Sequence, residues 1–224
     1  MEFKDVMARL KSVLVTPDSF FSTLKERSIE PSVLWYAVGM FLAVFIGGSG
    51  SVILTSVLGG VPIDKIVGMI TGQEIGVQAF LRYVLFLLLM WAVFVVGALA
   101  MAAFSYALSR VLGADSSYVK SVQMIAYCST PSYFAYAIPQ VLLMDTLTAT
   151  PLSSIIAVWW NNSVDYIQLA AIAYSTWIAW VGCRRYYRLS VVRTIVFFAI
   201  PAAIILFLVG GIVVLFSWLV PAVA

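Results

Sequence analysis

Long apolar stretches without charge alternate along the chain with short segments that carry charge. A helix needs about 20 apolar residues to cross the hydrocarbon core of a bilayer, because each residue adds about 1.5 Å. Five stretches reach or approach this length, and the predicted spans are residues 33–58, 83–109, 121–144, 166–183 and 194–220. The pattern predicts an all-α, polytopic membrane protein with a five-helix membrane domain over residues 32–224.

Residues 146–164 are also uncharged up to Asp165, but they are rich in Thr, Ser and Asn. Their apolar centre, residues 155–160, is too short to cross a membrane by itself. We expect this segment to form an outer loop, either interfacial or re-entrant. Trp159 and Trp160 suit the headgroup level, where amphipathic rings settle.

Residues 1–31 form a charged arm with its own helical periodicity. Apolar residues recur along one helical face from Phe3 to Leu14, and Thr16-Pro17-Asp18 is typical of a second helix start. We expect this arm to be cytoplasmic and to lie on the membrane surface, to bind a protein partner, or to do both. The candidate contact residues are Phe3, Met7, Leu10, Pro17, Phe20 and Phe21.

Composition supports a lipid environment and sets the orientation. Hydrophobic residues make up 63% of the 224 residues and charged residues 10%, against about 25% charged in soluble domains. All Lys and Arg residues except Lys65 and Arg82 fall on the arm and on the loops of one predicted side. The positive-inside rule therefore predicts a multi-pass protein of the cell membrane with its N-terminus in the cytoplasm and its C-terminus outside. The net charge of +3 is scattered, so no nucleic-acid partner is expected.

The chain contains no histidine. This excludes His-based acid–base catalysis and the Ser–His and Cys–His nucleophile pairs, and it removes the commonest metal ligand. Cys128 and Cys183 show no metal-type spacing. We expect no enzyme activity, no catalytic residues, no cofactor and no metal.

The third predicted span is unusually polar for a membrane helix. It contains two prolines, each of which removes a backbone hydrogen bond and kinks a helix. Freed backbone groups at membrane depth must be buried in protein or face a watery cavity. The span is therefore expected to face the bundle interior as a kinked structural helix, as a solute or ion site, or as a hinge or partner contact. Its candidate residues are Gln123, Tyr127, Pro131, Tyr133, Pro139 and Gln140.

Two further features have a structural and a functional interpretation. Small residues recur every fourth position of the first span, at Gly39, Ala43, Gly47 and Ser51, and such a row lets another helix approach closely. Whether it packs within one chain or in a homo-oligomer is open at this point. The fourth loop carries Arg184, Arg185 and Arg188, which either set the topology or contact anionic lipid headgroups.

The chain resembles the Yip1 family, and most closely its short prokaryotic branch. The resemblance rests on Pro17, Phe20 and Phe21 in the arm and on Ala126, Tyr127 and Pro131 in the third span. It implies a five-helix integral membrane protein with a cytoplasmic N-terminus. Eukaryotic members associate with prenylated Rab GTPases in vesicle trafficking and membrane shaping. Rab binding is not carried over, because the arm here is short and the Asp-Leu-Tyr-Gly-Pro element of many members is absent.

Together these features favour a non-enzymatic scaffold or adaptor in the bilayer, with a role in membrane organisation or trafficking-like processes. Its arm and basic fourth loop would engage the cytoplasmic leaflet and a protein partner. The alternative is a small-solute or ion facilitator whose path follows the kinked third span.

Overall fold

The computed structural model describes residues 3–25, 28–72, 77–142 and 151–219, and all regular elements in these ranges are helices. The predicted all-α class is confirmed. The helices are α1 (Phe3–Val15), α2 (Pro17–Thr23), α3 (Glu30–Gly59), α4 (Ile63–Thr71), α5 (Val77–Val111), α6 (Tyr118–Cys128), α7 (Thr130–Tyr136), α8 (Pro151–Arg185) and α9 (Val191–Leu219).

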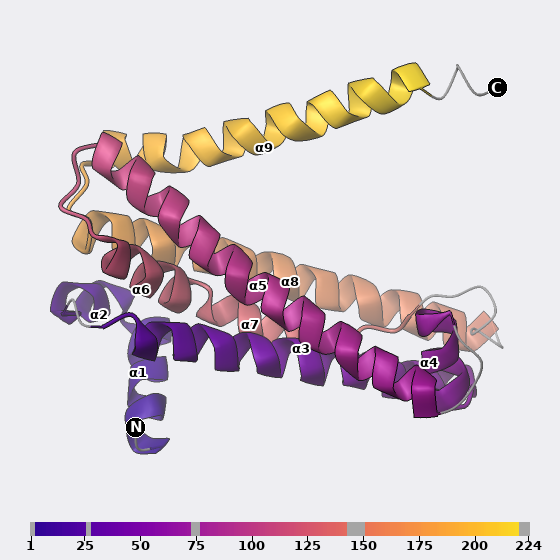
Figure 1. Ribbon diagram of the computed structural model, residues 1–224. Helices are drawn as coiled ribbons and strands as arrows, with labels where there is room; N and C mark the ends of the chain where they lie inside the picture. The colour runs from indigo at the N-terminus through magenta and orange to yellow at the C-terminus, as the bar shows by residue number, and fades with distance from the viewer. Residues whose placement is uncertain (1–2, 26–27, 73–76, 143–150, 220–224) are drawn as a thin grey trace.

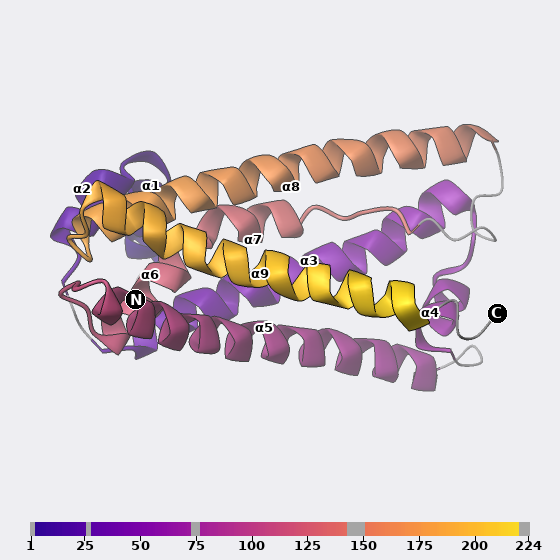
Figure 2. The same cartoon turned by 90° about the horizontal axis from the view of Figure 1, so that it is seen from above.

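The long helices α3, α5 and α8 run along the length of the bundle, and α6 and α7 follow one another between α5 and α8 (Figures 1 and 2). Helix α9 meets the others near its start and then diverges (Figure 1). In the described residues, α3, α5 and residues 191–208 of α9 are long and apolar enough to cross a membrane. The structure therefore defines a membrane protein with three candidate spanning helices.

The outer faces of the long helices remain apolar. Val57 is 73% exposed, Leu85 65% and Val96 66%, and many large apolar side chains near them are also exposed. An apolar surface of this extent is typical of helices that face lipid, which agrees with the composition.

The two ends of the bundle differ. Helices α1 and α2, the start of α6 and the α8–α9 loop gather at one end, and α4 lies at the other (Figure 1). Helix α1 lies crosswise to the long helices (Figure 1). The sequence analysis missed α4, which begins after Pro62 and ends at Gly72 in the left-handed conformation that glycine adopts without strain.

The expectation of a loop over residues 146–164 is wrong for its described part. Residues 151–164 form the first half of α8, which is 35 residues long, so the helix does not begin at the fourth predicted span. The polar residues do not end the helix because Asn161 uses its side chain to bond a neighbouring segment instead of its own backbone. Residues 146–150 lie outside the described ranges.

The third predicted span is shorter as a helix than expected. Helical structure begins at Tyr118, breaks after Cys128 and ends at Tyr136, so the prediction of a helix reaching residue 144 is wrong. Pro139 does not kink this helix, because the helix has already ended. Non-helical backbone continues to residue 142.

Candidate functional site

The break between α6 and α7 lies at Ser129, two residues before Pro131. Proline at the start of α7 has no N–H to donate, which explains why the α6 ladder cannot continue through it. Ser129 stabilises the break locally, since its backbone N–H and its hydroxyl both donate to the carbonyl of Ile125, at 3.2 and 2.8 Å. The sequence-predicted effect of Pro131 is thus present as a break between two helices.

Side chains of α3 bond part of the non-helical backbone after α7. Gln140 N–H donates to Ser51 Oγ at 2.9 Å, and Leu142 N–H donates to Thr55 Oγ1 at 2.8 Å. Ser51 of the small-residue row, and Thr55 one helical turn after it, therefore act as hydrogen-bond acceptors. Such partners are needed because unpaired backbone groups are costly at membrane depth.

Side chains of α8 bond the same segment from the other side. Asn161 Oδ1 accepts from the Val141 N–H, and Asn161 Nδ2 donates to the Val141 carbonyl, both at 2.8 Å. Trp160 Nε1 donates to the Pro139 carbonyl at 2.8 Å. The amide of Asn161 thus pairs with both the N–H and the C=O of Val141, as a residue of a neighbouring β-strand would. The sequence analysis overlooked Asn161, although an Asn next to a proline-broken span is a usable signal.

The row of small residues on α3 packs against α7 and the following segment of the same chain. A Cβ on Gly47 would collide with the backbone carbonyl oxygen of Tyr136, and one on Gly39 would collide with the Tyr133 ring. Ala43, between them, is 2% exposed. This arrangement answers the question left open by the sequence, because the row has its packing partner within one chain.

The other candidate side chains of the third span also have partners inside the protein. Gln123 accepts a hydrogen bond from the Tyr186 hydroxyl, and Tyr133 donates to the Ala126 carbonyl at 3.0 Å. Gln140 Nε2 donates to Asp165 at 2.9 Å, and Asp165 is exposed. The six candidates therefore do not all gather at one site, since the polar atoms of Gln123, Tyr133 and Gln140 bond to partners far apart in the sequence.

The arm docks on its own membrane domain. Phe21 is 1% exposed and Phe20 9%, and the Phe20 ring meets Tyr127 edge-on at 4.9 Å between centroids. Phe21 also lies near Tyr186, at 6.2 Å. Pro17 is buried as well. These three residues were predicted to contact the membrane surface or a partner, and that prediction is wrong because the chain itself covers them.

Polar contacts hold the arm in register with the bundle. Arg9 Nη1 donates to the hydroxyl of Tyr127 at 2.9 Å, and the Tyr174 hydroxyl donates to the Leu14 carbonyl. Asp18 pairs with Arg185 at 2.5 Å. Part of α1 stays accessible, and Met7 is 48% exposed there. Leu10 is partly buried, and nothing is described of the Phe3 side chain.

The fourth loop is organised by its arginines and tyrosines. Arg184 Nη1 donates to the Leu189 carbonyl at 2.7 Å and so closes the loop. Arg188 is exposed and adopts a positive φ of 56°, a conformation typical of tight turns. Tyr187 is fully buried and donates to Ser121 Oγ at 2.7 Å, and burial raises the pKa of its phenol. Of the three candidate lipid contacts, Arg184 and Arg185 thus have bonds within the protein.

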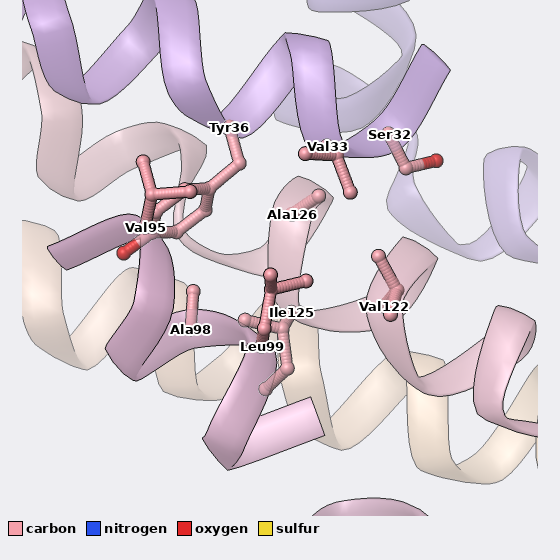
Figure 3. A pocket seen from close by; sticks show the side chains of 9 residues that line it. All are labelled: Ser32, Val33, Tyr36, Val95, Ala98, Leu99, Val122, Ile125 and Ala126. Atoms are coloured by element: carbon pink, nitrogen blue, oxygen red, sulfur yellow. The ribbon is translucent and has the colours of Figure 1, made fainter. Parts of the chain in front are cut away.

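A small cavity lies between α3, α5 and α6, where Tyr36, Val95, Leu99 and Ile125 face one another (Figure 3). Its volume is about 10 Å³, room for roughly one water molecule. In the described residues, no three His, Cys, Asp or Glu side chains lie close enough together to hold a metal ion. The described contacts of the candidate residues are hydrogen bonds and packing within the protein.

These features define a polytopic, all-helical membrane protein with a broken third span and a docked N-terminal arm. Residues 11–212 match the sequence model of the Yip1 domain. The chain therefore belongs to the Yip1 family, and the resemblance found in the sequence is confirmed. No curated protein and no solved structure matches the chain.

Proposed function

We propose that this Yip1-family protein is a non-enzymatic scaffold that crosses the membrane five times and presents a rigid platform at the cytoplasmic face. The platform consists of α1, α2 and the α8–α9 loop. The observation that carries the proposal is the docking of Phe20 and Phe21, because it fixes the crosswise helix α1 to the end of the bundle. A preorganised surface of this kind suits recognition, since little ordering entropy is lost on binding.

Five crossings are supported by the path of the chain. Helix α8 and the series α6, α7 and residues 137–142 run alongside α3 and α5 (Figures 1 and 2). Their polar groups bond inward, which lets segments of low hydropathy sit in the membrane. The platform end carries the basic residues of the arm and of the α8–α9 loop. We therefore propose that this end is cytoplasmic, that the C-terminus is outside, and that the protein resides in the cell membrane.

The scaffold proposal has a structural and a compositional basis. A helix held crosswise to the spans lies in the plane of the bilayer, where an amphipathic helix is stable at the headgroup boundary. Lys4 and Lys11 are exposed on α1, beside the exposed Met7. The non-enzymatic part rests on the absence of histidine.

The facilitator alternative gains no support from the third span. Tyr133 is 6% exposed and Gln123 3%, and their polar groups are bonded within the protein. A solute path needs polar groups that are open to water. The internal bonds favour the kinked structural interpretation instead.

Site-specific photo-crosslinking in cells tests the platform. A photoreactive residue at Asp5, which is exposed on the polar face of α1, is expected to give a protein adduct, while one at Met7 on the opposite side is expected to give lipid adducts. Phe21 is the matched control, because its buried position should yield only crosslinks within the chain. Lipid adducts alone at Asp5 would contradict the adaptor role and reduce α1 to a membrane anchor.

A further inference from the structure

Two neighbouring hollows at the platform end have complementary chemistry. The first, here called the basic chamber, has a volume of about 280 Å³ and is lined by Arg9, Lys25, Gln123 and Tyr127 among others. The second, the apolar groove, has about 1000 Å³ and lies between α1, α3 and α7. Volumes of roughly 300–1,000 Å³ are typical of ligand sites.

The two hollows adjoin each other. Pro31 lines both hollows. Of two successive residues of α1, Arg9 lines the chamber and Leu10 lines the groove. Trp35 of the groove lies 5.8 Å from the Tyr127 ring of the chamber, measured between centroids. One molecule with a polar head and an apolar tail could therefore occupy both.

The chamber is suited to an anion. The Arg9 guanidinium is held by its bond to Tyr127 Oη and lies over the Tyr127 ring at 6.0 Å from the centroid. Arginine has five N–H donors, so four remain for a ligand. In the described part of the chain, no carboxylate lies within ion-pair distance of Arg9 or Lys25. A fixed guanidinium beside a second cation is a typical phosphate-binding arrangement.

The groove is suited to an acyl chain. Its wall along α3 includes Leu34, Val38, Leu42 and Ile46, which are 48–64% exposed. From Glu30 to Ile46 this wall is about 24 Å long at 1.5 Å per residue, enough to cover one leaflet of a hydrocarbon core that is about 30 Å thick. Among the described residues that line the groove, Glu30 is the one that is acidic, so the two cations of the chamber outnumber it.

We propose that these hollows form a binding site for one anionic glycerophospholipid, with its phosphate in the basic chamber and an acyl chain in the apolar groove. The inference rests on the proposed placement of the platform at the cytoplasmic leaflet. It does not depend on a protein partner. The lipid would fasten α1 to α3 and thereby stiffen the platform.

Thermal unfolding of the full-length protein in detergent, with added lipid, tests this site. Dioleoylphosphatidylglycerol should raise the melting temperature by at least about 3 °C more than dioleoylphosphatidylcholine, because a ligand that binds only the folded state stabilises it. Glycerol 3-phosphate at the same concentration should have no effect, since it cannot fill the groove. An equal effect of the two lipids would overturn the proposal, and an equal effect of glycerol 3-phosphate would reassign the chamber to a soluble anion.

Substitutions in the chamber and in the groove test whether the lipid-dependent rise in melting temperature comes from this site. Lys25→Gln should reduce the preference for phosphatidylglycerol and Arg9→Gln/Lys25→Gln should abolish it, whereas Lys11→Gln on the exposed face of α1 should keep it. Val38→Trp should fill the groove and weaken binding of both lipids, whereas Val93→Trp on the exposed face of α5 should not. A full preference for phosphatidylglycerol in Lys25→Gln, together with unweakened binding of both lipids by Val38→Trp, would overturn the site, even if the double variant fails to fold. Purified protein contains no partner, so failure here is separate from failure of the crosslinking experiment.

Discussion

Single polar side chains replace the backbone partners that an unbroken third span would have supplied. Ser51, Thr55 and Asn161 bond the peptide groups of Gln140, Leu142 and Val141. In lipid no water is available as an alternative hydrogen-bond partner. The loss of a partner therefore lowers the free energy of unfolding more than it would at a solvated surface. The residues that matter most for this site therefore lie on α3 and α8, outside the broken span itself.

Asn161→Ala should lower the free energy of unfolding by about 2–4 kcal/mol, because two peptide groups of Val141 lose their partners at once. Thermal unfolding in detergent, followed by circular dichroism, measures the change. Asn162→Ala is the matched control at the exposed next residue and should shift the curve by less than about 0.5 kcal/mol. Equal effects of the two substitutions would contradict the role assigned to Asn161.

Gly47→Ala should destabilise the bundle by about 1–3 kcal/mol, because the new methyl group meets a backbone carbonyl that cannot rotate away. Gly97→Ala on α5 should be neutral or stabilising, since no atom lies within 4 Å of its added Cβ and alanine favours the helix. The same unfolding assay compares them. Equal stability of both variants would mean that α3 and α7 do not pack as described.

The elements at the platform end act as one packed unit. Helix α2 inserts aromatic side chains between α6 and α8, and α1 extends from it across the bundle. Most of the docking energy should come from this apolar burial, because an exposed ion pair contributes little. Deleting the whole arm would therefore expose the core as well as remove a surface, so point substitutions are the better probes.

Phe21→Ala should cost about 3–5 kcal/mol, as expected for an aromatic ring that is 1% exposed. The arm should undock and become sensitive to protease in permeabilised vesicles. Phe80→Ala, at a 57% exposed position of α5, is the control and should leave the arm protected. An arm that remains protected in Phe21→Ala would show that other contacts suffice.

Asp18→Asn should change stability by less than about 1 kcal/mol, because both partners of the Asp18–Arg185 pair are more than half exposed. The comparison with Phe21→Ala in one unfolding assay separates apolar docking from charge pairing. A loss equal to that of Phe21→Ala would mean that the pair, and not the rings, holds the arm.

The whole molecule combines a lipid-facing bundle with two unlike ends. The platform end carries most of the basic residues, and the opposite end carries α4. A charge asymmetry of this kind orients a protein during insertion. The packing contacts within the bundle would be the same in either orientation. The orientation is therefore determined by the distribution of basic residues over the whole molecule, and not by any single helix.

Cysteine labelling of intact cells tests this orientation. A membrane-impermeant maleimide should label Lys65→Cys on α4 from outside and should label Lys25→Cys only after permeabilisation. The native Cys128 and Cys183 are buried and give little background. Labelling of Lys25→Cys in intact cells would reverse the proposed topology.

The sequence by itself determined the class of the protein, the approximate span limits of α3 and α5, the helical arm and the break near Pro131. These features follow from local chemistry, namely apolar length, helical periodicity and the missing N–H of proline. It also pointed to the Yip1 family through residues of the arm and of the third span, and the family match confirms this.

Only the tertiary structure decided what each surface faces. The periodicity of Phe20 and Phe21 shows an apolar side but not whether lipid, a partner or the chain's own α6 and α8 cover it. The polar composition of residues 151–164 looked like a loop, because the bond of Asn161 to Val141 spans 20 residues and leaves no local pattern. Burial and long-range hydrogen bonds depend on which distant segments meet, and that is a property of the packed bundle.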